Sequence, residues 1–200
     1  MQNLWLDVRY GLRAMFKKTG TREELLDLNE ASREVLALIA RELQRAKSLV
    51  RTVLADDLPR VAGDRVQLQQ VVMNLVLNAA EAMRGIEDRP RQIVVRTQLD
   101  EADCVRLSVE DAGAGFDPQN SHRLFDAFYT TKRDGMGIGL SVSRSIIESH
   151  RGRLWAALND GPGATFSFSI PCAQADESAR TSESLKLPRS ASAEATMESR

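Results

Sequence analysis

The chain is poor in cysteine, in histidine and in long apolar runs. Its two cysteines, Cys104 and Cys172, lie in different segments without a CxxC spacing or a histidine at ligand spacing. This pattern argues against a zinc site and against a disulfide framework. No run of about 18 apolar residues could span a bilayer, and the start lacks the long apolar core of a secretion signal. The sequence therefore favours a soluble protein of the reducing cytoplasm.

An excess of charge of either sign is also missing. Lys and Arg number 27 against 28 Asp and Glu, for a net charge of −1. Because no global field would recruit nucleic acid or an acidic membrane, an anionic ligand must be held by local groups. With 42% hydrophobic residues, the 200-residue chain can bury a real core, and one globular unit with room for tails is expected.

Three regions differ in composition. Residues 1–20 place apolar side chains on one helical side and basic ones largely on another, which predicts a basic amphipathic segment. Such a segment could lie on a membrane surface, although packing onto a partner or onto the domain is commoner. Residues 28–171 carry the patterns of a folded domain. Residues 172–200 have almost no large apolar side chain, which predicts a disordered tail.

Hydrophobic periodicity predicts the elements of the domain. A helix is expected over 27–47, with an apolar side formed by Val35, Leu36, Leu38, Ile39 and Leu43. A strand over 48–55 precedes Asp64, the expected N-cap of a helix that ends near residue 84. Further along, the patterns predict a hairpin of strands 92–99 and 104–110, a helix over 138–149, and a closing hairpin of strands 153–158 and 165–170.

Two amides share one face of the helix predicted after Asp64. Asn74 and Asn78 stand four residues apart among apolar neighbours. A buried carboxamide without a hydrogen bond costs on the order of 1 to 3 kcal/mol, so these side chains should meet a partner. A capping or surface role is the ordinary alternative for either amide alone.

Glycines mark two further segments. Asp111 ends a predicted strand, and Gly113 and Gly115 behind it would let a ligand approach the backbone closely. Three alternate glycines enter the helix predicted at 138, where free amides and the positive end of the helix dipole suit phosphate; they are Gly135, Gly137 and Gly139. Between them, residues 125–132 form an aromatic loop that ends in Lys132. Each segment alone is more often a structural turn or a solvated face.

Taken in order, these segments resemble the catalytic, ATP-binding domain of sensor histidine kinases. The matching stretches are NLVLNAAEAM for the N box, EDAGAGFDP and DGMGIGLSVSRSIIESHRGRLWA for the two glycine boxes, LFDAFYTTK for the F box and GPGATFSFSIP for the last strand motif. The later boxes are most similar to those of kinases that carry PAS modules. The resemblance implies an α+β fold of the Bergerat type, a two-layer sandwich with helices on one face of a mixed sheet and ATP under a mobile lid.

The resemblance also implies roles for individual residues. Asn78 would hold Mg²⁺ against the phosphate oxygens, and Asn74 beside it would be a catalytic residue together with Lys132. Asp111 would accept a hydrogen bond from the adenine amino group. Gly113 and Gly115 would open the adenine pocket, with Thr165 supporting that side, and Lys132 would add a positive charge to the phosphates. The phosphate cradle would be formed by Gly135, Gly137, Gly139 and Leu140. Residues 116–136 would form the lid, packed down by Phe125, Phe128 and Tyr129.

Phosphoryl transfer rather than hydrolysis is the expected reaction. The gyrase and chaperone relatives place a glutamate base one turn before the Mg²⁺ asparagine, where this chain has Asn74, which cannot take a proton at neutral pH. A phospho-acceptor histidine is not visible, since neither His122 nor His150 has that sequence context. The acceptor is therefore expected in trans, on a histidine-bearing dimerisation domain or a partner kinase, with a response regulator involved only indirectly.

Two alternatives remain open. The missing acceptor and the basic start also fit a nucleotide-binding module without turnover, which docks on a partner kinase. A serine kinase of the anti-sigma type shares the implied fold, but the long F-box lid and the second glycine box match sensor kinases better. Transfer of radiolabelled phosphate to a histidine or to a serine of a partner would separate these functions.

Overall fold

The computed structural model describes residues 23–100, 103–130 and 136–173. The predicted amphipathic segment at 1–20 and nearly all of the predicted tail at 172–200 lie outside these residues. The domain boundaries at 28 and 171 stay predictions. Within the described part of the chain, no helix is both long enough and apolar enough to cross a membrane.

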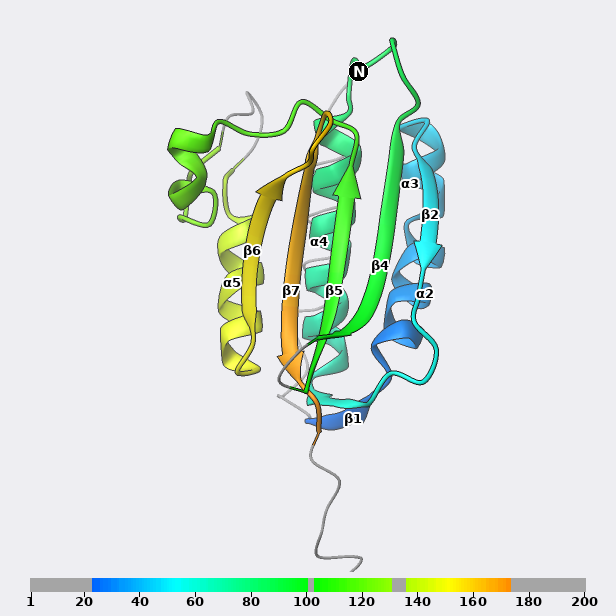
Figure 1. Ribbon diagram of the computed structural model, residues 1–200, viewed down its shortest axis with the longest axis vertical. Helices are drawn as coiled ribbons and strands as arrows, with labels where there is room; N and C mark the ends of the chain where they lie inside the picture. The colour runs from blue at the N-terminus through cyan, green and yellow to red at the C-terminus, as the bar shows by residue number, and fades with distance from the viewer. Residues whose placement is uncertain (1–22, 101–102, 131–135, 174–200) are drawn as a thin grey trace, which may run out of the picture.

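A five-stranded mixed sheet forms one layer (Figure 1). Its strands are β2 (Leu49–Val53), β4 (Gln92–Asp100), β5 (Cys104–Asp111), β6 (Arg153–Leu158) and β7 (Ala164–Pro171), in the order β2-β4-β5-β7-β6. The β2–β4 pair is parallel and the other pairs are antiparallel. Both predicted hairpins are confirmed, and so is the prediction of a mixed sheet.

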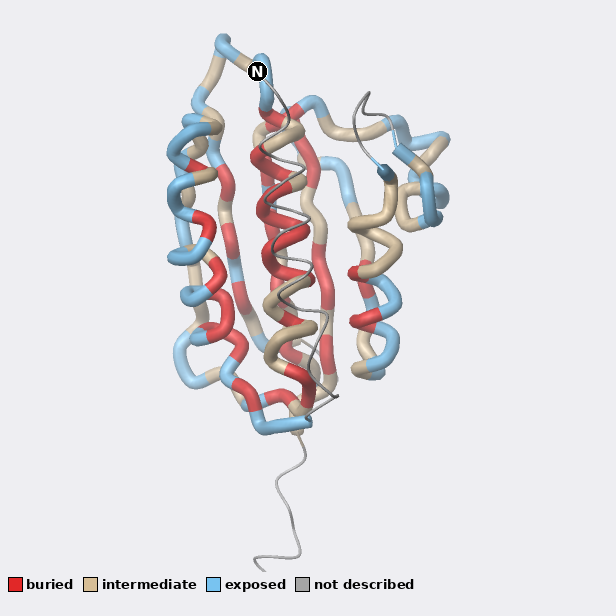
Figure 2. The backbone as a smooth tube through the Cα atoms, turned by 180° about the vertical axis from the view of Figure 1, so that it is seen from behind, coloured by how far each residue is buried: buried red, intermediate tan, exposed pale blue. Residues whose placement is uncertain are grey.

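The helices cover one face of this sheet. Figure 2 shows α4 (Arg65–Ala82) in the middle of the helical layer, with α2 (Leu28–Leu38) and α3 (Ala40–Arg45) on one side and α5 (Gly139–Ser149) on the other. Inward-facing residues of β4 and β5, such as Val95 and Leu107, are fully buried beneath α4. The fold is therefore the predicted α+β two-layer sandwich.

The central helix starts where its capping residue predicts. Asp64 has extended backbone angles, and its carboxylate accepts a hydrogen bond from the backbone N–H of Gln67 at 3.0 Å. Val71, Val72 and Leu75 on α4 are at most 1% exposed. Burial continues around most of the helix, because α2, α5 and the sheet enclose it on three sides.

The first predicted helix is broken, and one of its predicted core residues is exposed. Ile39 leaves helical geometry between α2 and α3, yet Val35, Ile39 and Leu43 remain buried on one side across the break. The spacing of apolar residues therefore continues unchanged across the break and does not predict it. Leu38 is 53% exposed, so its prediction as part of the apolar side was wrong; it falls outside the i, i+4 row that faces the core.

Three short elements were not predicted. The strands β1 (Glu24–Leu26) and β3 (Val61–Gly63) form a small antiparallel sheet at the end of the molecule where β7 ends (Figure 1). The 3₁₀ helix η1 (Pro118–Arg123) lies within the predicted lid. Runs of this length leave no clear period in the sequence.

Candidate functional site

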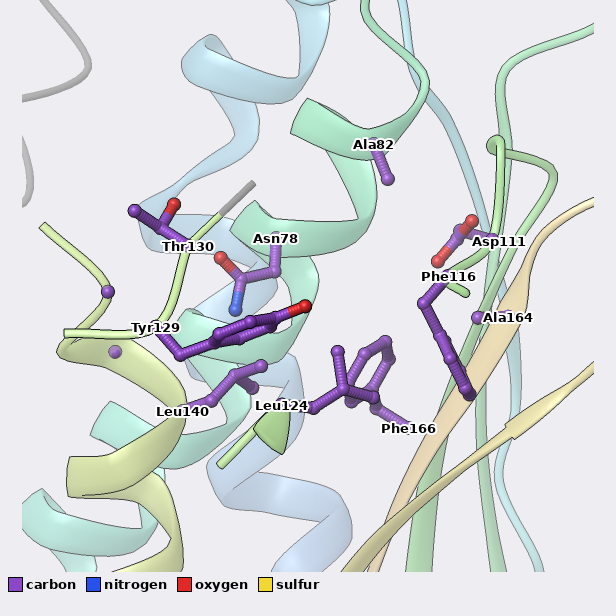
Figure 3. Close-up of a pocket in the computed structure, with 13 residues that line it drawn as sticks. Asn78, Ala82, Asp111, Phe116, Leu124, Tyr129, Thr130, Leu140, Ala164 and Phe166 are labelled. Atoms are coloured by element: carbon purple, nitrogen blue, oxygen red, sulfur yellow. The ribbon is translucent and has the colours of Figure 1, made fainter. Parts of the chain in front are cut away.

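A cavity of about 140 Å³ opens where the end of β5, the C-terminal part of α4 and the start of α5 meet the 115–130 segment. Figure 3 shows Asn78 and Thr130 at one end, with the ring of Tyr129 beside Asn78, and Asp111 and Ala164 at the other end. The complete lining consists of Asn78, Ala82, Asp111, Gly115, Phe116, Leu124, Tyr129, Thr130, Gly137, Gly139, Leu140, Ala164 and Phe166.

The two predicted amides of α4 have different surroundings. Asn78 is half-buried and lines the cavity. Asn74 is 7% exposed and faces α5, where its Nδ2 lies 3.3 Å from Ser143 Oγ and 3.5 Å from the carbonyl oxygen of Gly139. Four residues are one turn plus about 40°, and α5 covers that turn of α4. Asn74 therefore does not line the cavity, and a direct catalytic role for it stays a prediction.

Asp111 and the glycines behind it form a compact turn. The carboxylate of Asp111, which is 3% exposed, accepts a hydrogen bond at Oδ1 from the backbone N–H of Gly113 at 2.8 Å. A Cβ on Gly113 would lie 2.6 Å from that same oxygen, so this position admits no side chain. Gly115 lines the cavity, whereas Gly113 acts on it through Asp111.

The turn is held by Arg89, which the sequence analysis missed. Its Nε donates to the carbonyl oxygen of Ala112 at 2.9 Å, and its Nη2 donates to that of Gly113 at 3.2 Å. Because Arg89 lies in the loop between α4 and β4, no local pattern connects it with residues 112 and 113.

Thr165 does not line the cavity, whereas its neighbours Ala164 and Phe166 do. Side chains alternate across a strand, so residue 165 of β7 points to the face opposite that of residues 164 and 166. The Thr165 hydroxyl donates a hydrogen bond to Asn159 Oδ1 at 2.7 Å. Support for the adenine side from Thr165 therefore has to be indirect, through Asn159.

The second glycine segment forms the wall of the cavity opposite β7. Gly137, Gly139 and Leu140 all line the cavity, and Gly139 opens α5. Gly137 has a φ of +65°, and a Cβ there would lie 2.5 Å from the backbone carbon of Phe128. The predicted site residues Lys132 and Gly135 fall outside the described residues.

Only part of the predicted aromatic cluster packs down. Phe125 and Phe116 both make edge-to-face contacts with Phe166, with ring centroids 6.4 and 6.3 Å apart, and Tyr129 lines the cavity. Phe128 is 77% exposed, so its predicted packing was wrong. Its backbone has a φ of +67° and donates a hydrogen bond to Gly137, which leaves the ring pointing to solvent.

The cavity offers an amide, a carboxylate and a helix start rather than a cluster of metal ligands. Among the described residues, no group of three or more His, Cys, Asp or Glu side chains could hold a metal ion by itself. Mg²⁺ needs few protein ligands when substrate phosphates and water complete its shell, and an amide oxygen such as that of Asn78 suits it. The residues present therefore fit a ligand that brings both a hydrogen-bonding base and phosphates.

Comparison with known proteins assigns the family. The model of the histidine kinase-, DNA gyrase B- and HSP90-like ATPases matches residues 63–174, more than half of the chain. The chain belongs to this family. The catalytic domain of the histidine kinase ThkA aligns at 33% identity and a TM-score of 0.65, over 77% of this chain and 97% of that one. This histidine kinase-like ATPase is therefore an ATP-binding catalytic domain of the sensor-kinase type.

Similar sensor proteins are much longer than the alignment. The sensor protein FixL of Bradyrhizobium diazoefficiens is 49% identical over 113 residues, which are 56% of this chain and 22% of FixL. The sensor histidine kinase TmoS of Ectopseudomonas mendocina is 32% identical over 82% of this chain and 17% of TmoS. The chain thus spans about a fifth of the length of these relatives.

Proposed function

We propose that this domain binds Mg·ATP in the cavity between α4 and α5 and transfers the γ-phosphate to a histidine presented by another domain or chain. The observation that carries the proposal is the position of Asn78 and Asp111 at the two ends of one cavity. Because a nucleotide presents its base and its phosphates at opposite ends, such a cavity can hold both. The proposal places the domain in the cytoplasm, where ATP is available.

Asp111 is the proposed acceptor for the adenine amino group. Its carboxylate is buried and oriented by the Gly113 amide, so it presents a fixed charge rather than a mobile one. Ala164 and Phe166 give this end of the cavity an apolar wall suited to a purine ring. Gly115 also lines the cavity.

The phosphates would lie at the start of α5. Gly137, Gly139 and Leu140 line this end, and the N-terminal amides of α5 suit phosphate. Asn78 would hold Mg²⁺ through its amide oxygen, and a bound Mg²⁺ would neutralise charge on the transferring phosphoryl group. Lys132 and Gly135, which lie outside the described residues, would also contact the phosphates.

Transfer is favoured over hydrolysis, because Asn74 takes no proton and so supplies no base to activate water. The proposed acceptor is the histidine of a dimerisation hairpin or of a partner kinase. His150 does not suit that role, since both of its ring nitrogens are engaged within the fold, at 3.0 Å from the Asp64 amide and 2.7 Å from the Ile146 carbonyl oxygen. His122 lies exposed on η1, without an acceptor helix around it.

An indirect connection to a response regulator is supported by a relative. The structure of ThkA in complex with the response regulator TrrA aligns at 28% identity and a TM-score of 0.67, over 84% of this chain and 48% of that chain. The alternative, a nucleotide-binding module without turnover that docks on a partner kinase, rests on the absence of a suitable acceptor among the two histidines.

Calorimetric titration of Mg·ATP into the wild type, Asn78→Ala and Asp111→Ala tests the site. Micromolar binding that is weakened about tenfold or more in both variants would support it, since each variant removes an interaction with a charged group. Unchanged binding in either variant would contradict that residue's assignment. Radiolabelled ATP incubated with this domain and an isolated histidine-bearing helical hairpin of a sensor kinase then tests catalysis: labelled hairpin supports transfer, and bound but untransferred ATP favours the docking module.

A further inference from the structure

A polar side chain from a distant loop holds the end of β5 beside the cavity. Asn159 lies in the loop between β6 and β7, and its Nδ2 donates a hydrogen bond to the backbone carbonyl oxygen of Asp111 at 2.9 Å. The same amide nitrogen lies 3.2 Å from the carbonyl oxygen of Pro162, within its own loop. Its oxygen accepts the Thr165 hydroxyl at 2.7 Å. The amide nitrogen of Asn159 therefore donates to two carbonyl oxygens, and its oxygen accepts one hydrogen bond.

The hydrogen bond from Asn159 reaches the backbone of Asp111 at the point where the pairing between β5 and β7 ends. Asp111 is still paired with Ile93 of β4, but the β5–β7 register ends at the pair Glu110 and Thr165, so the carbonyl of Asp111 is the first beyond the ladder on the β7 side. A backbone carbonyl buried without a partner is costly, and here the Asn159 side chain supplies a hydrogen bond where the pairing with β7 ends. Gly163 packs against the same carbonyl so closely that a Cβ would overlap it.

The direction of the Asp111 carboxylate depends on this backbone. Asp111 Oδ1 is already bonded to the Gly113 amide two residues on, so the side chain and the turn move together. Asn159 orients the carbonyl between them, and Thr165 orients the amide of Asn159. The path from Thr165 through Asn159 to Asp111 thus connects the outer face of β7 with the cavity.

We infer that Asn159 is a positioning residue for recognition of the base: it holds Asp111 where its carboxylate meets the adenine amino group, and Thr165 fixes Asn159 for that purpose. This inference rests on the proposed role of Asp111, and it assigns to Asn159 and Thr165 a part in the selectivity of the site for adenine. Asn159 acts on the base through Asp111, because Asn159 is absent from the cavity lining.

The test compares ATP with purine riboside triphosphate, which lacks the amino group and cannot donate to Asp111. Dissociation constants of both nucleotides with Mg²⁺ are measured on the full chain for the wild type, Asn159→Ala, Thr165→Val and the control Asp160→Ala, an exposed neighbour in the same loop. In the wild type, we expect ATP to bind roughly tenfold or more tightly than the analogue, as for one hydrogen bond to a charged acceptor.

The inference requires that Asn159→Ala reduce this preference at least about threefold, with the affinity for the analogue changed less than about twofold. Thr165→Val should lower the preference in the same direction by a smaller factor, and Asp160→Ala should leave it unchanged. A parallel loss of affinity for both nucleotides in Asn159→Ala would mean a merely structural role and overturn the inference. Should Asn159→Ala not fold, Thr165→Val decides alone, since it keeps the Asn159 side chain and removes only the hydroxyl that orients its amide.

Failure of the proposed role of Asp111 gives a different result from failure of the role of Asn159. Equal affinity of the wild-type protein for the two nucleotides would remove Asp111 as the reader of the amino group, and the inference with it, before any variant is compared. Loss of the preference in Asp111→Ala, together with an unchanged preference in Asn159→Ala, would keep the proposed function and overturn only the role of Asn159.

Discussion

Asn74 and Ser143 join the two helices that enclose the cavity: Nδ2 of Asn74 on α4 lies 3.3 Å from Oγ of Ser143 on α5. The Ser143 hydroxyl in turn donates to the carbonyl oxygen of Gly139 at 2.9 Å, so it accepts from Asn74. Through Ser143 this pair ties the first turn of α5, which begins with the cavity residue Gly139, to the central helix α4.

Replacing Ser143 by alanine should destabilise the fold. Ser143 is fully buried, and its loss leaves the Asn74 amide with only the long 3.5 Å contact to Gly139. We expect the free energy of unfolding, measured by urea titration, to fall by about 1 to 2 kcal/mol. The control is Ser145→Ala on the exposed side of the same helix, which should stay within about 0.5 kcal/mol of the wild type. Equal effects of the two substitutions would mean that the Asn74–Ser143 hydrogen bond does not stabilise the packing of α5 on α4.

The two histidines should differ in their contribution to stability. His150 ends α5, and its Nε2 accepts the backbone N–H of Asp64 at 3.0 Å while Nδ1 lies 2.7 Å from the Ile146 carbonyl oxygen. Nδ1 must therefore carry the proton. His150→Ala leaves the Asp64 N–H without this acceptor, so the free energy of unfolding should fall by about 1 to 3 kcal/mol. His122→Ala, at an exposed position of η1, should change it by less than about 0.5 kcal/mol; a comparable loss there would refute the distinction.

Two glycines of one loop should differ in their tolerance of an added methyl group. Gly163 has a φ of +99°, and its Cβ would overlap the carbonyl of Asp111. Gly163→Ala should lower the free energy of unfolding by more than about 2 kcal/mol and weaken ATP binding, because both backbone strain and the Asp111 turn are affected. Gly161 has nothing within 4 Å of its Cβ position, so Gly161→Ala should be nearly neutral in thermal unfolding and in ATP titration. A neutral Gly163→Ala would show that this turn can shift freely.

An ion pair between α2 and α4 should add a pH-dependent increment to stability. The hydrogen bond from Arg65 holds the pKa of Glu34 below its ordinary value of 4.5, with Arg65 Nη2 2.6 Å from Glu34 Oε1. A lowered pKa in the folded state means that the contribution is present above the ordinary pKa and is lost as the pH falls through the folded-state pKa. Because both groups are partly exposed to solvent, we expect only about 0.3 to 1 kcal/mol.

The measurement compares urea unfolding of the wild type and Glu34→Gln between about pH 3 and pH 7. The wild type should be more stable near neutral pH, and the difference should disappear at the acid end. Glu87→Gln, at an exposed acid in the loop before β4, serves as the control and should show no such trend. A difference that persists or grows in acid would reverse the assigned sign.

Much of the fold followed from local patterns. The Asp64 cap, the length of α4 and the two hairpins were predicted, because capping chemistry and the periods of apolar residues are properties of neighbouring positions. The break at Ile39 was not predicted, because the apolar row continues through it. The exposure of Phe128 depends on the left-handed backbone that pairs it with Gly137, which no period reports.

The site was predicted in part for the same reason. The predicted residues that line the cavity each belong to a recognisable stretch of sequence; they are Asn78, Asp111, Gly115, Gly137, Gly139 and Leu140. Arg89 and Asn159 were missed, since each acts by one side chain on a backbone carbonyl of another segment. Support of the adenine side by Thr165 stays a prediction; strand alternation turns its side chain away from the cavity and could have shown that Ala164 lines it.

The sequence by itself determined which residues could carry the chemistry and which family they belong to, because capping, periodicity and motif order are written in consecutive residues. Tertiary structure alone decided that Asn78 meets the cavity while Asn74 meets Ser143, and that Asn159 reaches Asp111 across 48 positions of the chain. The physical reason is that a buried polar group is satisfied by whatever partner the packing brings within hydrogen-bond distance, and distance in space is set by the order of the strands and the crossing of the helices.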